Sequence, residues 1–134
     1  MSTLDEINKA VNILVSSGTN KKNITILQCH SDYPTKYKDV NLNAIKTIKN
    51  KFGVNVGFSD HTLGSEVALG AIAYGARIIE KHFTLNKKLS GPDHSSSLEP
   101  HEFKKLIIKI RNLEQAFGSY IKKPSNIESK NKLI

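Results

Sequence analysis

Residues 54–84, VNVGFSDHTLGSEVALGAIAYGARIIEKHFT, decide the fold of this chain. The stretch holds two short apolar runs, Val54–Phe58 and Ala76–Ile79, and each run ends abruptly in polar, ionisable residues. Between them lies Glu66–Tyr74, which is rich in Ala and Gly and long enough for about two to three helical turns. The order of strand, helix and strand predicts a βαβ unit of a parallel sheet.

The predicted strands bring two histidines to one edge of the sheet. His61 closes the sequence Ser-Asp-His after the first run, and His82 closes Glu-Lys-His after the second. The carboxyl ends of parallel strands emerge on one face, where catalytic groups collect. Since His61 and His82 are 21 residues apart, about one βα repeat, we expect their imidazoles to lie side by side.

A pair of neutral imidazoles can bind a divalent first-row metal ion. Two protein ligands leave positions open for substrate and water, which suits a catalytic ion. His61 and His82 are therefore candidate catalytic and metal-ligating residues. The alternative, which stays open, is that each histidine caps the following helix or bonds within its own loop.

Further helices and strands are expected on both sides of this unit. A capping box of Thr3 and Glu6 predicts a helix that Gly18 ends. The remaining expected elements are a strand buried on both faces at Ile24–Cys29, a polar loop at His30–Val40, a helix capped by Asn41 and stopped by Gly53, a long loop at 84–98, and a last helix from Pro100 to Gly118.

Four motifs carry a resemblance to a known family. They are CHSDYPT at 29–35, GFSDHTLG at 57–64, EKHFTLN at 80–86 and GPDHSSSLEP at 91–100. In this order and with these gaps, they resemble the sialic acid synthases. These N-acetylneuraminate synthase-like enzymes condense phosphoenolpyruvate with an amino sugar.

The resemblance implies a particular fold, an α/β fold that is part of a TIM barrel. The expected order of elements matches the last three βα units of the family's (β/α)8 barrel, which needs about 200–250 residues. We expect residues 1–118 to be the C-terminal half of the synthase barrel and residues 119–134 a linker towards an absent antifreeze-like domain. The chain is then a fragment that lacks the N-terminal barrel half, with two unpaired strand edges.

The resemblance also implies roles for six residues. His61 and His82 would hold a divalent ion, Mn²⁺ or Mg²⁺, that polarises the sugar aldehyde. Ser59 and Ser31 would contact phosphoenolpyruvate, although the Ser31 position is Asn in some relatives. Tyr33 and Asp93 would contact the sugar. The family's phosphate-gripping lysines and its general acid/base glutamate belong to the first barrel half, and the full-length enzyme is expected to be a homodimer.

Simpler structural roles remain open for several of these residues. Ser59 could cap the following helix, Tyr33 could anchor its loop beside Pro34, and Asp93 could close an Asx turn. Asp60 is expected to stand at the start of a helix or to orient a metal ligand, and not to bind the metal itself. Glu80 and Lys81 are expected to form an ion pair at the barrel rim.

Composition restricts the class of protein. The chain has 134 residues, 38% of them hydrophobic, and no apolar run long enough to cross a membrane. Its single cysteine, Cys29, excludes an internal disulfide and fits a reducing cytoplasm. The net charge of +8 comes from scattered lysines without aromatic interleaving, so we expect no nucleic-acid partner. Another metal-dependent aldolase or isomerase barrel fragment, or a noncatalytic basic module, stays open.

Overall fold

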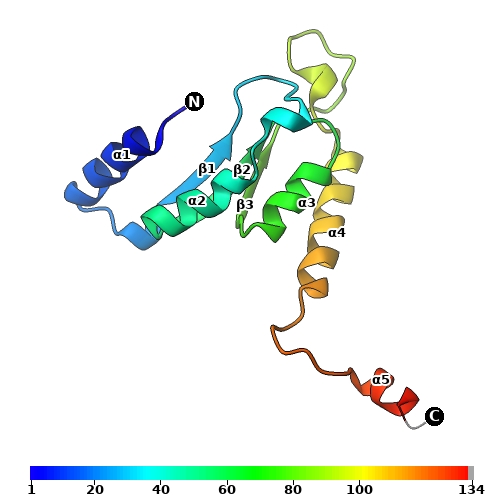
Figure 1. Cartoon of the computed structure of the whole chain (residues 1–134). Coiled ribbons are helices and arrows are strands. Elements are labelled where there is room, and N and C mark those ends of the chain that lie inside the picture. Colours follow the sequence, from blue (N-terminus) through cyan, green and yellow to red (C-terminus); the bar gives the residue numbers. More distant parts are fainter. Residues whose placement is uncertain (133–134) are drawn as a thin grey trace.

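A computed structural model describes residues 1–132 and contains a three-stranded parallel sheet with helices packed on it (Figure 1). The strands β1 (Thr25–Cys29), β2 (Asn55–Asp60) and β3 (Ile78–Lys81) lie in the order β1-β2-β3. Cys29 pairs with Ser59 on β2, and the last pair between β2 and β3 joins Asp60 to Lys81. The carboxyl ends of the strands are therefore aligned at one edge, and the predicted α/β fold with parallel strands is confirmed.

Within the described residues, helices pack along one face of this sheet, except for a short last helix that lies away from it. They are α1 (Leu4–Ser16), α2 (Asn43–Phe52), α3 (Glu66–Ala73), α4 (Pro100–Ala116) and the short α5 (Asn126–Asn131). Figure 1 shows α2 and α3 beside the strands and α4 against α3. The loop between β3 and α4 stands above the carboxyl ends of the strands, where it can reach the predicted site.

The core lies between the sheet and these helices. Ile45 and Ile48 of α2 pack with Val56 and Phe58 of β2, and all four side chains are buried. Because strand side chains alternate between faces, Val56 and Phe58 mark the face of β2 that the helices cover. The neighbouring residues of β2, Gly57 and Ser59 among them, belong to the other face.

Several helix ends follow the predicted local signals. Thr3 and Glu6 form the expected capping box, with the Thr3 backbone N–H donating to a Glu6 carboxylate oxygen at 2.7 Å. Gly53 ends α2 in the left-handed conformation at φ 58°, which glycine adopts without steric cost. Pro100 is in the first turn of α4, where its missing N–H costs no helical hydrogen bond.

Several predicted boundaries are wrong. The second strand runs from Asn55 to Asp60 and not from Val54 to Phe58, because Ser59 and Asp60 still pair with β3. Asn41 does not cap α2, because it takes a left-handed conformation at φ 53° and Leu42 occupies the cap position without a side-chain bond. The third strand runs from Ile78 to Lys81 and not from Ala76 to Ile79. It starts later because the Ala76 N–H still donates to the Ala71 carbonyl at the end of α3, and it ends later because its pairing with β2 continues to Lys81. The polar residues Glu80 and Lys81 are thus part of the paired strand.

Burial on both faces was predicted for β1 but applies only to β2. All five residues of β1 are half-buried, whereas β2 is buried from Val56 to Asp60. In β3, Ile78 is 46% exposed. Within the described residues, β1 and β3 each have one edge without a neighbouring strand, which explains their exposure.

The segment after α4 extends away from the sheet (Figure 1). It contains α5, which the sequence did not predict and which a capping box of Ser125 and Glu128 opens. All of its residues from Phe117 to Lys132 are exposed. The linker at 119–134 stays a prediction, and its last two residues lie outside the described part of the chain.

Candidate functional site

The ends of β2 and β3 present different side chains on the two faces of the sheet. Ser59 and Glu80 are paired residues, and the Ser59 hydroxyl donates to Glu80 Oε1 at 2.5 Å. Asp60 and Lys81, one residue further along, form an ion pair of 2.8 Å with side chains 0% and 2% exposed. Since side chains alternate, these two polar pairs lie on opposite faces.

The two histidines that follow these strands lie side by side, as expected. The ring centroids of His61 and His82 are 5.1 Å apart, with the ring planes 80° to each other. Tyr33, from the loop after β1, joins them. Its ring centroid is 4.0 Å from that of His82 and 5.2 Å from that of His61. Three consecutive strand ends thus bring three aromatic rings together.

The Tyr33 side chain is held in this position by the loop between β3 and α4. Its hydroxyl is 3.4 Å from the Ser97 hydroxyl, which in turn donates to the Asp93 carbonyl at 2.7 Å. Burial raises the pKa of the Tyr33 phenol above its ordinary value of 10.0, while the Ser97 hydrogen bond opposes the shift. The phenol is therefore neutral at pH 7.

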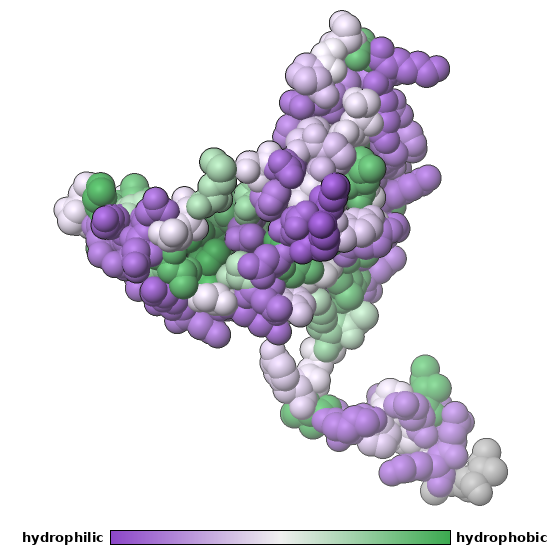
Figure 2. All heavy atoms as spheres, turned by 45° about the horizontal axis from the view of Figure 1, so that its top comes forward, coloured by the Kyte–Doolittle hydropathy of each residue, from purple (hydrophilic) through white to green (hydrophobic). Residues whose placement is uncertain are grey.

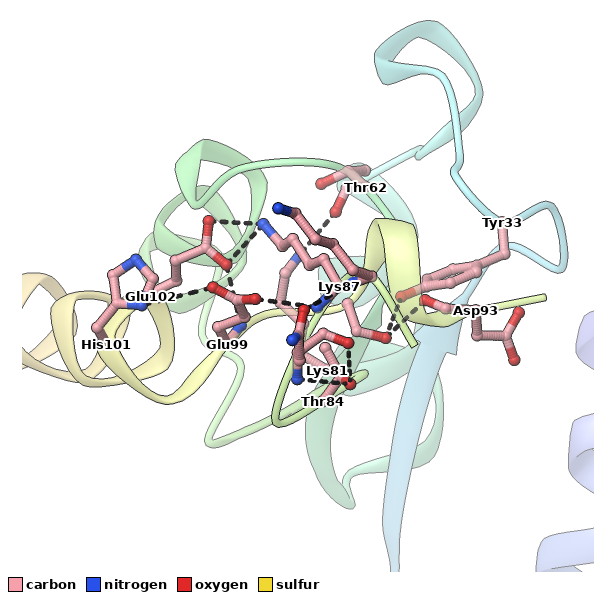
Figure 3. Close-up of polar contacts among 12 residues, drawn as sticks. Tyr33, Thr62, Lys81, Thr84, Lys87, Asp93, Glu99, His101 and Glu102 are labelled. Carbon is pink, nitrogen blue, oxygen red and sulfur yellow. Dashed lines mark hydrogen bonds and ion pairs between the residues drawn. The ribbon is translucent and has the colours of Figure 1, made fainter. Parts of the chain in front are cut away.

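Asp93 lies beside His82 on the same rim. Its Oδ2 is 3.9 Å from Nδ1 of His82, and its side chain is 54% exposed. The Asp93 carboxylate is thus open to solvent, next to the imidazole pair. Figure 3 shows Asp93 and Tyr33 near each other at this end of the loop.

The loop that carries Asp93 is fastened at its other end to α4. Lys87 Nζ is 2.6 Å from the Glu102 carboxylate, and the Lys87 backbone N–H donates to Glu99 Oε1 at 2.9 Å (Figure 3). Within the loop, the Thr84 hydroxyl is 2.8 Å from Nδ1 of His94. These contacts give the loop a defined path over the strand ends.

The other predicted site residues differ in their placement. Ser59 is not a helix cap, because it lies within β2 and bonds to Glu80. Ser31 is exposed in the loop after β1, and its side chain makes no hydrogen bond to the described residues. The structure therefore brings Ser59 to the strand ends near the histidines and gives Ser31 no such contact.

The expected ion pair of Glu80 with Lys81 is wrong. These adjacent residues of a strand point to opposite faces, so Lys81 pairs with Asp60 and Glu80 bonds to Ser59. Glu80 is thus a residue of the site face that sequence reasoning missed. Its position two residues before His82 was the signal, because residues i and i+2 share a face of a strand.

The described residues supply part of the ligand set that a divalent ion needs. The described residues contain no cluster of three or more His, Cys, Asp or Glu side chains arranged to hold a metal. The two imidazoles of His61 and His82 are a suitable pair of nitrogen ligands, and Cys29 Sγ lies 3.9 Å from His61 Nε2. Ligands beyond the two imidazoles would have to come from substrate, water or other residues.

The fold and the site together define a class of α/β protein in which parallel βα units carry polar side chains and histidines at the carboxyl ends of the strands. Residues 1–122 match the model of the NeuB family, and the chain belongs to that family. It is 49% identical over 131 residues to N,N'-diacetyllegionaminic acid synthase of Campylobacter jejuni, covering 98% of this chain and 39% of the relative. It is 42% identical to human N-acetylneuraminate-9-phosphate synthase over 72% of this chain and 27% of the relative.

A solved structure agrees with this assignment. N-acetylneuraminic acid synthetase from Leptospira borgpetersenii, crystallised with citrate, superimposes with a TM-score of 0.85 at 36% identity, covering 98% of this chain and 45% of that one. The chain thus spans less than half the length of these relatives. Among residues 1–132, no helix has the length and apolar character needed to cross a membrane.

Proposed function

We propose that this chain supplies the last three βα units of a (β/α)8 barrel in a sialic acid-type synthase. Such an enzyme condenses phosphoenolpyruvate with an N-acetylmannosamine-type sugar and releases phosphate. The observation that supports this proposal best is the pair of imidazoles, with centroids 5.1 Å apart, at neighbouring strand ends of a NeuB-family chain. The further barrel strands would cover the open edges of β1 and β3.

The reaction forms one carbon–carbon bond and breaks one bond to phosphate. Carbon 3 of phosphoenolpyruvate attacks the aldehyde carbon of the open-chain sugar, water adds at carbon 2, and phosphate leaves. Negative charge develops on the aldehyde oxygen as the new bond forms. Groups at the barrel rim can lower the activation free energy by stabilising this negative charge.

His61 and His82 would hold a divalent ion, Mn²⁺ or Mg²⁺, at this rim. When bound, the ion supplies Lewis-acid stabilisation of the charge on the aldehyde oxygen. The Tyr33 ring, against His82, limits the space beside the imidazoles and holds the His82 ring in its orientation. A neutral phenol suits this position, since a phenolate would repel anionic phosphoenolpyruvate.

The remaining side chains would orient the substrates. The Asp93 carboxylate, 3.9 Å from His82 and half exposed, can accept hydrogen bonds from sugar hydroxyls. Ser59 is buried beside Glu80 and would donate to a phosphoenolpyruvate oxygen only by turning its single hydroxyl hydrogen away from Glu80. Ser31, exposed and without a bond of its own, would contact phosphoenolpyruvate only once the remaining barrel units close over the site. Phosphate binding itself would require lysines from the other barrel half.

The test is phosphate release by the synthase that contains this chain. The sugars to compare are N-acetylmannosamine, its 6-phosphate and the dideoxy-diamino sugars that lead to legionaminic and pseudaminic acids. The diacetylated precursor of legionaminic acid is the first choice, because the Campylobacter jejuni legionaminic acid synthase is 49% identical. Metal removal should abolish release, and Mn²⁺ or Mg²⁺ should restore it. No release with any of these sugars in the presence of metal would contradict the proposal.

A further inference from the structure

Lys81 reaches from β3 to both residues that flank His61. Its Nζ donates to Oδ2 of Asp60 at 2.8 Å and to the carbonyl of Thr62 at 2.6 Å. The Lys81 and Asp60 side chains are almost completely buried. A single ammonium group on one strand therefore holds the polypeptide on either side of the histidine that follows the neighbouring strand.

The turn around His61 is closed by the same carboxylate. Oδ1 of Asp60 accepts from the Thr62 backbone N–H at 2.9 Å and from the Thr62 hydroxyl at 2.7 Å. This is an Asx-type turn with His61 at its centre. Thr62 is 2% exposed, and no buried side-chain nitrogen or oxygen of the described residues lacks a hydrogen-bond partner. Since every buried side-chain nitrogen and oxygen of this network has a hydrogen-bond partner, the positions of Asp60, Thr62 and Lys81 are closely constrained.

The ion pair is also the last connection between the two strands before the histidines. Pairing of β2 with β3 ends at Asp60 and Lys81. Beyond it the backbones bond elsewhere: the His61 carbonyl accepts from Thr35 at 2.9 Å and the His82 carbonyl from Leu98 at 2.9 Å. This contact lies one residue before each of the two histidines.

We propose that Asp60 and Lys81 are positioning residues that set the separation of the His61 and His82 imidazoles. They would thereby determine whether the two rings can share one divalent cation. The role in cation binding rests on the proposed function, whereas the role in ring separation does not. Buried ion pairs often add little net stability compared with apolar residues, so geometry is the better explanation for this one.

The test uses the double variant Asp60→Asn/Lys81→Met in the synthase that contains this chain. It removes both charges together, leaves an amide oxygen for the Thr62 donors and creates no unpaired buried charge. We expect melting close to that of the parent, an imidazole separation that departs from 5.1 Å in a crystal structure, and a Mn²⁺ affinity lower by about 10–100-fold. The exposed pair Arg111 and Glu114 provides the control, since Arg111→Gln/Glu114→Gln should change neither quantity.

The outcomes separate this inference from the proposed function. An unchanged ring separation in the folded double variant would overturn the positioning role, whatever the metal affinity. If the parent binds no Mn²⁺ and yet the rings move in the variant, the positioning role stands and the metal role fails. If the double variant does not fold, Lys81→Arg, which keeps the buried charge pair but changes the length and shape of the side chain, gives the same reading: displaced rings support the proposal, and undisplaced rings overturn it.

Discussion

Glu80 and Lys81 are neighbours in β3, yet their side chains bond on opposite faces of the sheet. Glu80 accepts the Ser59 hydroxyl on the open face, and Lys81 binds Asp60 beneath the helices. The carboxylate therefore belongs to the face of the proposed substrate site, while the ammonium group is removed from it. This separation keeps a fixed positive charge away from a site that is proposed to bind a cation.

The imidazole pair can be tested by metal binding. His61→Ala and His82→Ala should each weaken Mn²⁺ binding by more than the roughly 10–100-fold that loss of a supporting hydrogen bond costs, because each removes a ligand. Electron paramagnetic resonance of free Mn²⁺ measures the affinity. His101→Ala, which removes a 63% exposed imidazole paired with Glu99, is the matched control. Equal affinity in all three variants would exclude the metal site.

Asp93 should act on the sugar and not on phosphoenolpyruvate. In the proposed synthase, Asp93→Ala should cost about 1–3 kcal/mol in kcat/KM for the sugar, since a hydrogen-bonded partner is lost. Steady-state kinetics with each substrate varied in turn give both values. Asp32→Ala, at another exposed loop aspartate, is the control. Equal losses for both substrates would mean that Asp93 only shapes its loop.

The fastening of the loop by Lys87 should depend on pH. The hydrogen bond from Lys87 holds the pKa of Glu102 below its ordinary value of 4.5. The contribution to stability is therefore complete above pH 4.5 and is lost as the pH falls through the lower, folded-state pKa. Hydrogen exchange of residues 84–98 should rise in that acid range, and Glu102→Gln should raise it already at pH 7. Glu128→Gln, which removes another carboxylate with a lowered pKa, should leave this loop unchanged.

Gly57 should resist substitution more than Gly70. A Cβ at Gly57 would lie 2.7 Å from the Ile78 carbonyl oxygen, which belongs to the backbone of β3 and cannot easily move. A Cβ at Gly70 would meet only the end of the Leu42 side chain, at 2.9 Å. Gly57→Ala should therefore destabilise by about 1–3 kcal/mol. Gly70→Ala should be nearly neutral, because helix propensity offsets the contact. Denaturant unfolding measures both, and equal losses would contradict the contact argument.

Residues 1–134 expressed by themselves should associate. Strands β1 and β3 each have an open edge within the described residues, and large apolar side chains such as Ile78, Phe83 and Leu85 are about half or more exposed. Figure 2 shows hydrophobic side chains, in green, exposed among hydrophilic ones on the surface in view. Light scattering should detect oligomers, and a dye for apolar surface should bind. Co-expression with the first five βα units should suppress both and add metal-dependent phosphate release. A cooperatively melting, active monomer would refute the partial-barrel proposal.

Much of the fold could be predicted from local patterns. The apolar runs Val54–Phe58 and Ala76–Ile79 predicted two parallel strands, because two short apolar runs on either side of a helix are typical of a βαβ unit. The Thr3 capping box and Gly53 fixed helix ends through backbone chemistry that depends on few residues. These features are local, and local interactions can be inferred from adjacent residues.

The errors arose where tertiary contacts decide. Polarity placed the end of the third strand at Ile79, but pairing with β2 continues through Glu80 and Lys81. The partner of Lys81 could not be deduced from its neighbour Glu80, because it depends on the register with β2. Asn41 was expected to cap a helix and instead takes the left-handed conformation. Asn is common both at helix N-caps and in left-handed turns, so its identity alone could not decide between the two.

The alternation at the end of β3 also limits how the sequence can change by insertion or deletion. One residue added to this strand before Glu80 would exchange the faces of Glu80 and Lys81. An ammonium group would then stand beside His61, His82 would leave that face together with Glu80, and the Glu80 carboxylate would be buried without a counter-ion. Changing the length of the strand here by two residues would therefore keep the Glu80 carboxylate on the face of the histidines. Changing it by one residue would replace this negative charge with the positive charge of Lys81.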